Sequence, residues 1–557
     1  MPGPAPAEPR LDALDVLVLD CQATGATPRH GRVIEIAWAR ARAGDGPADP
    51  PLTHHLVALP AGEHVPRIVT QVTGITTDEL EGAPQPADVW RALLDAAASE
   101  APFPTVIHFS TFEQRFLEDW HAAHSPAGAP FPLELLCTHQ LARRIFPGLP
   151  TRGLHALAGH LGLVLEDQRH ASDHVRATAL VWKALVPRLA ERGVHTLPDL
   201  RALLEAPAPK AARTDYPVQR QARLQAPDAP GVYRMRASTG ELLYVGKATS
   251  LRRRVNSYFT RKWTGDGRKQ EMLTMAATVE WTVTQSVVEA AILESDQIKE
   301  LEPRFNQALR ARAAEVWFAA SSLAEARPAP DGQFPLGPLP SPHALAPLPA
   351  LQRLFGEPAV PDEVQRHALG LPGLRHLPDP AALAEGVSRV RRRRALGPAP
   401  RLAALLKAGA ALWTEPDDDD DEDGDDQVFD WATYWEDPEN VAKTLEDALR
   451  HAAHLLRRAR WFHQLRDAVV SWDQGQRRRW LKLAAGRVAD RGDARSTSEV
   501  PPPEADPSPL DFAGYERLRI LTTELRTLML RGADADVRVP GDRPIPGGRL
   551  LRRLRWV

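Results

Sequence analysis

The chain has 557 residues, too many for one hydrophobic core, so we expect about three or four compact domains joined by linkers. Apolar residues make up 43% and charged residues 25%, as in soluble globular proteins, and no apolar run of about 18 residues could span a membrane. The formal net charge of -3 gives no bulk electrostatic support for a nucleic-acid partner. Its two cysteines, Cys21 and Cys137, exclude a disulfide framework and a cysteine-based zinc site. Because MPGPAPAEPR lacks the features of a secretory signal, we expect a cytoplasmic protein.

The first periodic segment alternates predicted strands with predicted helices. Apolar and β-branched runs predict strands at 15–20, 32–40 and 104–109. Apolar residues at helical spacing predict helices at 88–99, 111–121 and 170–185. This is an α/β pattern. The Pro- and Ala-rich stretch after it, within 189–227, is expected to be a linker.

The central segment, 228–312, is expected to be compact. It reads as two short strands (GVYRMRA and LLYVGKA), a basic helix from Ser250, a strand near VEWTVT and a helix at 287–301. The two strands form a hairpin that brings Tyr233 and Tyr244 together, beside glycines that let a substrate backbone approach.

The remaining chain is expected to be mainly helical. We expect a follow-on region at 313–415, an acidic linker at 416–430 and packed helices in 431–557, because apolar residues recur at helical spacing in 441–470 and 515–530.

Three features of this half have two interpretations each. Arg389 and the run 391–394 could contact DNA phosphates or form the solvated face of a helix. The carboxylates of 417–426 most simply form a disordered solubilising linker, and the alternative is autoinhibition by mimicry of DNA phosphate. A place in a core or interface is favoured over base stacking for the tryptophans Trp431, Trp435, Trp461 and Trp472.

Three motifs of the central segment, PGVY, LLYVGKATSLRRRVNSYF and VEAAILESDQIKELEPRFN, resemble the GIY-YIG nuclease domain of the excision-repair subunit UvrC and its relative Cho. At each position that is functional in this family, the chain has the family's residue type. These residues are Tyr233, Tyr244, Gly246, Lys247, Arg254, Glu294 and Asn306. A YxG hairpin or a basic helix alone occurs in many unrelated proteins, but the joint pattern favours a nuclease site. A short match at 334–356 resembles the segment that follows this domain in UvrC-like proteins.

The resemblance implies metal-dependent hydrolysis of a phosphodiester. Such hydrolysis needs a hard oxygen ligand for Mg²⁺ or Mn²⁺, a base for the attacking water and cations around the developing charge. The resemblance makes Glu294 the metal ligand, and we favour Tyr244 as base, with Tyr233 beside it. Lys247 and Arg254 would supply the cations that a tyrosine base needs.

The basic helix buries Leu251, Val255 and Tyr258 as its apolar stripe. Cations on and after it are expected to contact DNA phosphates: Arg252, Arg253, Arg261 and Lys262. Asn306 is expected to orient ligands by hydrogen bonding.

Residues 13–188 resemble the DnaQ-like, DEDDh-type 3′–5′ exonuclease domain of the proofreading ε subunit, on motifs that include LVLDCQATGATP, VIHFSTFEQRFL and LEDQRHASDHVRAT. The resemblance implies an RNase H-like fold. It also implies a site where four carboxylates hold two divalent ions and a histidine activates water.

The first two motifs keep the family's pattern only in part. Asp20 stands where the family's first Asp stands, but Gln22 replaces a bridging Glu and Glu113 replaces an Asp.

The third motif departs further. His170 is present, but Val175 takes the place of the family's last Asp. Asp173 falls short of that place, and a one-residue gap would put His174 in it. At most three carboxylates remain, so we expect lost or weak exonuclease activity and a platform role. The alternative for both histidines is a structural or solvated place on a helix.

We therefore expect a structure-specific, repair-associated DNA endonuclease of the bacterial nucleoid. We expect a single incision, because UvrC's second nuclease domain is not evident. The substrate would be distorted or damaged duplex, and repair or replication proteins would be the partners. One alternative is a 3′–5′ exonuclease or proofreading-type subunit, against which Gln22 and Val175 argue. Another is a non-catalytic DNA-binding scaffold, against which Glu294 and the tyrosine pair argue.

Overall fold

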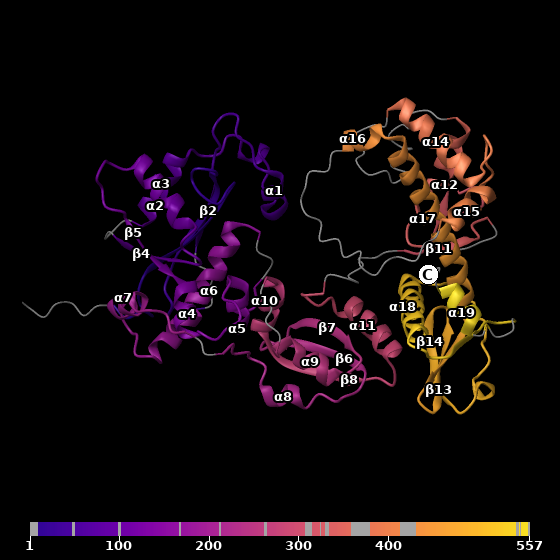
Figure 1. Ribbon diagram of the computed structural model, residues 1–557. Coiled ribbons are helices and arrows are strands. Elements are labelled where there is room, and N and C mark those ends of the chain that lie inside the picture. Colours follow the sequence, from indigo (N-terminus) through magenta and orange to yellow (C-terminus); the bar gives the residue numbers. More distant parts are fainter. Residues whose placement is uncertain are drawn as a thin grey trace, which may run out of the picture. The chain divides into compact units, whose positions relative to one another are not determined.

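The computed structural model describes residues 9–46, 51–97, 102–165, 169–210, 213–260, 265–306, 315–323, 325–328, 333–357, 379–412, 431–541, 545 and 547–554. The chain forms two compact units, Met1–Thr284 with Leu301–Ala308 and Gln285–Glu300 with Leu309–Val557 (Figure 1). The acidic tract lies outside the described residues. Among the described helices, none is long and apolar enough to cross a membrane.

The first unit begins with a five-stranded sheet in the order β3-β2-β1-β4-β5. Its strands are β1 (Val16–Ala23), β2 (Val33–Ala41), β3 (Leu52–Leu56), β4 (Phe103–Ile107) and β5 (Leu133–Cys137). β1 pairs antiparallel with β2 and parallel with β4. The outer pairs are β2 with β3, antiparallel, and β4 with β5, parallel. This mixed sheet confirms the predicted RNase H-like fold; β3 and β5 were not predicted.

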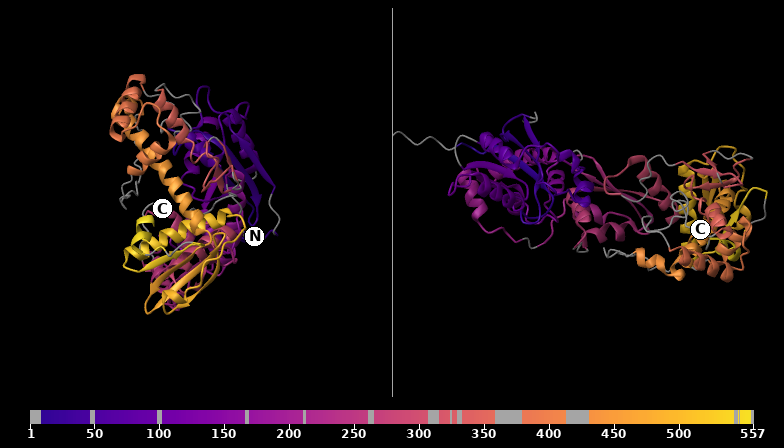
Figure 2. Two further views of the ribbon diagram at one scale, coloured as in Figure 1. Left: turned by 90° about the vertical axis from the view of Figure 1, so that its right-hand side faces the viewer. Right: turned by 90° about the horizontal axis from the view of Figure 1, so that it is seen from above.

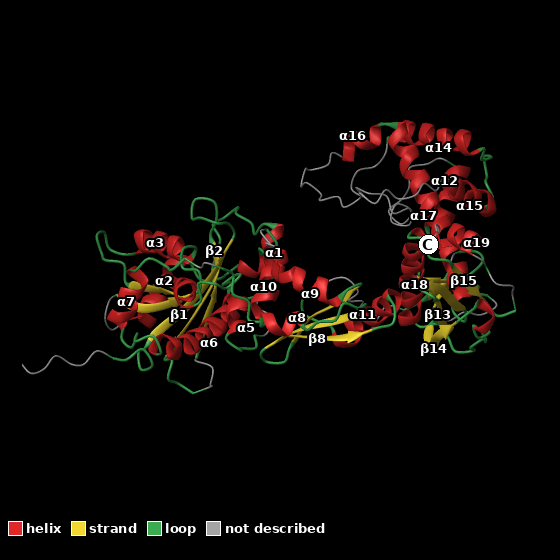
Figure 3. Cartoon of the chain, turned by 60° about the horizontal axis from the view of Figure 1, so that its bottom comes forward, coloured by secondary structure: helices red, strands yellow, loops and turns green. Residues whose placement is uncertain are grey.

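Helices cover both faces of this sheet (Figure 3). Val16 and Val18 join one core and Leu17 and Leu19 the other, because successive strand residues point to opposite faces. The helices are α1 (Arg67–Thr73), α2 (Pro86–Ala97), α3 (Glu113–His124), α4 (Thr138–Ile145), α5 (Leu154–His160) and α6 (Ala171–Ala190).

The segment 189–227, expected to be a linker, contains two helices, α7 (Leu197–Glu205) and α8 (Arg220–Leu224). Leu200 of α7 is fully buried in one core of the first domain. Its N-cap Thr196 accepts a hydrogen bond from the backbone of Asp199, a side-chain cap that starts the helix. Part of the expected linker therefore belongs to the first domain.

The central segment forms a three-stranded antiparallel sheet in the order β7-β6-β8. Its elements are β6 (Gly231–Ala237), β7 (Leu242–Ala248), α9 (Leu251–Thr260), α10 (Gly267–Met275) and β8 (Ala276–Val283). α9 buries the three residues of its predicted apolar stripe. α10 packs against α5 of the first domain, where Gly159 leaves room for Met275 and the Thr151 N–H donates to Thr274 Oγ1 at 3.2 Å.

Two large hydrophobic cores lie among the described residues of the second unit. The first lies among β9 (Trp317–Ala319), β10 (Ala326–Arg327), β11 (Leu336–Leu339), α12 (Pro347–Gly356), α14 (Pro380–Arg394), α15 (Leu402–Ala411), α16 (Trp431–Glu436) and α17 (Pro438–Leu465). The arginine run of α14 pairs with α17: Arg393 lies 2.7 Å from Glu439 and Arg394 lies 2.7 Å from Glu446. These contacts favour the structural interpretation of the run over DNA contact.

The second core lies on a four-stranded sheet in the order β14-β13-β12-β15. Its strands are β12 (Val469–Gln474), β13 (Arg477–Ala484), β14 (Arg487–Ala494) and β15 (Ala535–Arg538), and the helices that pack with it are α11 (Val287–Leu301), α18 (Phe512–Leu530) and α19 (Gly547–Leu554). The predicted helices of 431–557 are present, but this sheet was not predicted. The helix expected over 441–470 is wrong at its end, because α17 stops at Leu465 and Val469 opens β12.

The long helix α17, one of the orange helices in Figure 2, takes part in both cores. Leu445 and Leu449 lie in the first core, and Phe462 and Leu465 lie in the second. Three of the four tryptophans considered for base stacking are buried in these cores, namely Trp435, Trp461 and Trp472. For these three the predicted core position is confirmed.

Candidate nuclease sites

Three tyrosines of the central domain form one cluster. Tyr233 on β6, Tyr244 on β7 and Tyr258 on α9 have ring centroids 6.0 to 6.3 Å apart. The Tyr233 and Tyr258 hydroxyls are hydrogen-bonded at 2.9 Å. The sequence predicted Tyr258 only as part of an apolar stripe. A hydroxyl at a buried helix position was the feature that could have indicated a polar partner.

Burial separates the two tyrosines of the hairpin. Tyr233 is 0% exposed, and this burial, with smaller contributions from Tyr258 and Tyr244, raises its pKa well above the ordinary value. The Tyr233 hydroxyl therefore stays protonated at neutral pH and serves as a hydrogen-bonding group. Tyr244 is partly exposed. This difference supports Tyr244 over Tyr233 as the candidate base.

Gly246 makes room for the tyrosine cluster. It lies directly opposite Tyr233 in the β6–β7 register. A Cβ at this position would collide with the Tyr233 hydroxyl and lie 2.8 Å from Cε1 of Tyr244. The tyrosines themselves therefore require a glycine here, in addition to any approach by a substrate.

Arg254 on α9 is a cation that lies at this cluster. Its guanidinium carbon lies 5.1 Å from the centroid of the Tyr258 ring. Lys247 follows Gly246 on β7 and is partly exposed.

The predicted DNA contacts on α9 have partners within the domain. Arg252 Nε donates to the Ala226 carbonyl at 2.9 Å. Arg253 is largely exposed, with Nε 3.9 Å from a carboxylate oxygen of Asp228. The other two predicted contacts, Arg261 and Lys262, lie outside the described residues.

Asn306 holds strand β7 in place. Its Oδ1 accepts a hydrogen bond from the Val245 N–H at 2.9 Å, and its Nδ2 donates to the Val245 carbonyl, also at 2.9 Å. The side chain is buried, and both of its polar groups are used in this way. Because Val245 lies between Tyr244 and Gly246, Asn306 fixes the backbone of these two residues, whereas we had expected it to orient ligands.

Glu294 lies near the middle of α11 and is partly exposed. It belongs to the second compact unit, whereas the tyrosine cluster, Lys247, Arg254 and Asn306 belong to the first. A partly exposed carboxylate on a helix is a donor that fits Mg²⁺ or Mn²⁺.

The degenerate exonuclease site centres on a carboxylate–imidazole pair. Asp20 on β1 is buried, and its Oδ2 lies 3.3 Å from Nδ1 of His174 on α6. Burial lowers the pKa of His174, but its interaction with Asp20, together with the charges of Asp173 and Glu35, raises that pKa above the ordinary value. Val175 is buried in the core. His174, which a one-residue gap would align with the family's last Asp, therefore faces Asp20 with its imidazole.

A buried carboxylate that the sequence did not single out, Glu35 on β2, binds two other histidines. Its Oε1 lies 2.7 Å from Nε2 of His54 and 3.1 Å from Nδ1 of His170, and its Oε2 accepts from the Ala171 N–H at 3.0 Å. Glu35 thereby caps the start of α6. A single Glu inside the apolar strand VIEIAWARA was the available signal. His170 is thus half exposed and in contact with a carboxylate of the sheet.

The remaining exonuclease candidates also have local partners. Gln22 Nε2 donates to the Arg169 carbonyl at 2.7 Å, and Asp173 Oδ2 accepts from the His170 N–H at 3.2 Å. Glu113 opens α3, and burial, followed by the charge of Asp20, raises its pKa to about 9. Its carboxyl is therefore neutral at pH 7. Across the described part of the chain, no three His, Cys, Asp or Glu side chains are grouped so as to hold a metal ion.

Two families of known proteins match the chain. A model described as a UvrC-like GIY-YIG domain matches residues 229–307, and one described as an exonuclease matches residues 17–180. A bifunctional exonuclease/endonuclease protein of Mycobacterium tuberculosis is 33% identical over 251 residues, which are 44% of this chain and 36% of that protein. The UvrABC system protein C of Beutenbergia cavernae is 55% identical over 80 residues, which are 14% of this chain and 12% of that protein.

Among solved structures, the GIY-YIG N-terminal endonuclease domain of UvrC from Thermotoga maritima, bound to magnesium, is 33% identical. The match covers 16% of this chain and 93% of that chain, with a TM-score of 0.14. The chain spans 36% of the length of the M. tuberculosis relative. It joins an exonuclease-family domain to a UvrC-like GIY-YIG domain.

Proposed function

We propose that the protein is a metal-dependent DNA endonuclease of repair that cuts one strand of a distorted or damaged duplex at its GIY-YIG site. The observation that carries this proposal is the hydrogen-bonded Tyr233–Tyr258 pair beside the partly exposed Tyr244, within the segment that matches the UvrC-like family. Such a buried hydrogen-bonded pair contributes little net stability compared with apolar side chains of the same shape. Its presence supports a catalytic use.

The chain's own residues divide the work of hydrolysis. Tyr244 would take the proton of the attacking water, helped by the cations Lys247 and Arg254, because a tyrosine otherwise titrates near pH 10. Arg254 would also bind the scissile phosphate through its guanidinium fork. Glu294 would hold Mg²⁺ or Mn²⁺, which supplies positive charge to the phosphate and acidifies bound water.

The first domain would serve as a platform for DNA without hydrolysing it. The support is the set of side chains around Asp20: an imidazole faces it, and the carboxyl of Glu113 is neutral at pH 7. Two divalent ions need several ionised carboxylates around them. In this interpretation the exonuclease fold contributes a surface, and the GIY-YIG site contributes the chemistry.

A second candidate function, 3′–5′ exonuclease activity, is favoured by the match to the exonuclease family and by the name of the M. tuberculosis relative. A third candidate is a DNA-binding scaffold without catalysis. The test is cleavage of a fluorescein-labelled duplex with one bulky adduct, in Mg²⁺ or Mn²⁺, by the wild type and the Glu294→Ala and Asp20→Ala variants.

A discrete nick that only Glu294→Ala abolishes would support the proposal. A ladder of shortened products that Asp20→Ala abolishes would support the exonuclease instead. Binding without cleavage under any condition would support the scaffold.

A further inference from the structure

The helix that carries Glu294 is built into the core of the C-terminal sheet. Val288 and Ile292 of α11 are buried in the same core as Trp472 of β12 and Tyr515 of α18. These apolar contacts hold α11 against residues that follow it by nearly two hundred positions or more. The helix α11 lies within the segment that matches the nuclease family, but the core that holds it is formed by residues outside that segment.

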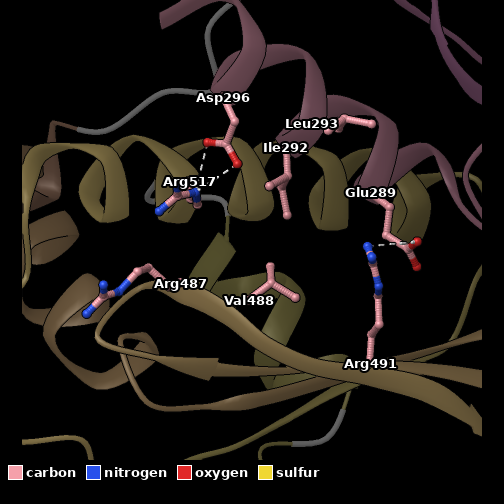
Figure 4. Close-up of a pocket in the computed structure, with 8 residues that line it drawn as sticks. All are labelled: Glu289, Ile292, Leu293, Asp296, Arg487, Val488, Arg491 and Arg517. Carbon is pink, nitrogen blue, oxygen red and sulfur yellow. Dashed lines mark hydrogen bonds and ion pairs between the residues drawn. The ribbon is translucent and has the colours of Figure 1, made fainter. Parts of the chain in front are cut away.

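Ionic contacts of the C-terminal domain hold α11 on both sides of Glu294. On the N-terminal side, Arg479 of β13 donates to Glu289 at 2.7 Å, and these side chains are only 7% and 5% exposed. On the C-terminal side, Arg517 of α18 donates to both oxygens of Asp296, at 2.8 and 3.1 Å. Figure 4 shows Asp296 and Arg517 directed toward one another across the space between the two helices.

A third arginine completes the contact on the N-terminal side. Arg491 of β14 places Nη1 3.7 Å from Oε2 of Glu289, as the dashed line in Figure 4 marks. The pocket between α11 and these elements has a volume of about 300 Å³ and is lined on the helix side by Glu289, Ile292, Leu293 and Asp296. The contacts thus all use one face of α11.

Glu294 points away from this face. Residues of an α-helix are rotated by about 100° from one to the next, so Glu294 lies roughly opposite the stripe formed by Val288, Ile292 and Asp296. Any rotation or shift of α11 within the C-terminal domain therefore moves the Glu294 carboxylate by a similar amount. When a metal ligand is displaced by about 1 Å, the site binds its metal more weakly and the enzyme loses much of its activity.

We propose that Arg479 and Arg517 are positioning residues of the nuclease, through which the C-terminal domain fixes the orientation of the helix that presents Glu294. This inference rests on the proposed function, in which Glu294 is the metal ligand. Neither arginine is required to touch DNA or the metal. Removing a cation on one side would let α11 fray or rotate while Val288 and Ile292 still hold it in the core.

The test uses the full-length protein and the Asp296–Arg517 pair, because it is the more exposed of the two and the less critical for folding. The variants are Arg517→Ala, Arg517→Lys and the charge exchange Asp296→Arg with Arg517→Asp. The matched control is Arg519→Ala, on the same helix, whose ion pair at 2.9 Å is with Glu516 of that helix. Circular dichroism and a thermal melt check that each variant is folded.

Hydrogen–deuterium exchange over 287–301 is measured in the metal-free protein. Mn²⁺ binding is measured by electron paramagnetic resonance, and the nicking rate is measured as a function of Mn²⁺ concentration. We expect Arg517→Ala to exchange faster over α11 and to need about tenfold more Mn²⁺ for binding and for half-maximal nicking. Arg517→Lys and the charge exchange should recover most of this loss, and Arg519→Ala should match the wild type.

A folded Arg517→Ala with wild-type exchange and wild-type Mn²⁺ binding would overturn the inference. If the wild type nicks DNA, Glu294→Ala does not, and Arg517→Ala behaves as the wild type, the inference fails and the proposed function stands. If Glu294→Ala nicks and binds Mn²⁺ as well as the wild type, the proposed function itself fails, whatever the exchange data show.

Discussion

The hydroxyl of Tyr233 lies 2.9 Å from that of Tyr258, and the Arg254 guanidinium lies over the Tyr258 ring. One of these tyrosines comes from a strand of the hairpin and the other from the helix that follows it. The pair therefore couples the orientation of the hairpin to that of the basic helix, and it makes Tyr258 part of the candidate site.

Replacing Tyr258 by Phe should lower the nicking rate without unfolding the domain. The ring and its contacts stay, and one hydrogen bond worth about 1 kcal/mol is lost, so we expect about a fivefold fall in kcat and little change in KM. The measurement is nicking under saturating Mn²⁺. Tyr216→Phe is the control, since Tyr216 packs on Phe259 in the same core and is not part of the cluster. Equal kcat values for the two variants would contradict a role for Tyr258.

Replacing Gly246 by Ala should damage the site by steric conflict. The new Cβ would meet the Tyr233 hydroxyl and Cε1 of Tyr244, so the tyrosines must move or the hairpin must open. We expect a loss of about 1–3 kcal/mol in the free energy of unfolding and a nicking rate below detection.

Gly267→Ala is the matched control for this change. Gly267 lies at the start of α10, where an added Cβ would meet nothing within 4 Å. Alanine should be neutral or slightly stabilising there. If Gly246→Ala melted and nicked like the Gly267→Ala protein, the steric account of the tyrosine cluster would be wrong.

Restoring carboxylates to the first domain should restore metal binding there. The double variant Gln22→Glu with His174→Asp, made on a Glu294→Ala background, places acids beside Asp20 where an amide and an imidazole now lie. We expect about 5 mM Mn²⁺, on the order of 100 times a Kd of about 50 μM, to raise its free energy of unfolding by about 2.7 kcal/mol. Thermal melts with and without Mn²⁺ measure this difference.

The comparison protein is the Glu294→Ala single variant. Mn²⁺ should not raise its melting temperature by binding at Asp20, because His174 and the neutral Glu113 do not supply the negative charge that a divalent ion needs. An equal Mn²⁺ response in both proteins would show that the first domain already holds metal, and the exonuclease candidate would gain from that result.

Glu113 should make the metal-free protein less stable as the pH rises. Burial raises its folded-state pKa from 4.5 to about 9, so above pH 4.5 the unfolded chain loses this proton while the folded chain keeps it. The free energy of unfolding therefore falls with pH between these values, by up to about 3 kcal/mol at pH 7.

Glu113→Gln removes this titration and should flatten the decline. The measurement is urea unfolding in EDTA at about pH 5, 7 and 8.5, which lie between the unfolded-state and folded-state pKa values of Glu113. We expect the variant to gain most over the wild type at pH 8.5. A constant difference between the two proteins at all pH values would mean that Glu113 is already ionised in the folded state.

Much of the first unit could be predicted because its elements are locally encoded. β1 is apolar on both faces, and the tyrosines, glycine and cations of the central segment lie within the stretch that matches the UvrC-like GIY-YIG family. β3 and β5 were missed because their sequences, LTHHL and LELLC, are short and carry no alternation that separates a strand from a loop.

The C-terminal sheet was missed for a different reason. β13 and β14 read RRRWLKLA and RVADRGDA, in which charged residues occupy strand positions that have ionic partners elsewhere in the fold. Arg478, for example, is buried because it pairs with Asp536 of β15, a contact between residues far apart in the chain. Local composition cannot reveal such partners, and the same holds for the Tyr258 hydroxyl and for Glu35.

The placement of α11 has a consequence for how such chains can be rearranged in evolution. A segment that is inherited as a family unit, 229–307, does not coincide with a unit of folding, because Glu289 and Asp296 find their counterions 190 and 221 positions later. Moving that segment alone into another protein would leave two acidic side chains and an apolar stripe without their partners. We therefore expect these helix positions and their arginines to covary among homologues, so that lineages without the C-terminal sheet carry different residues on this face of the helix.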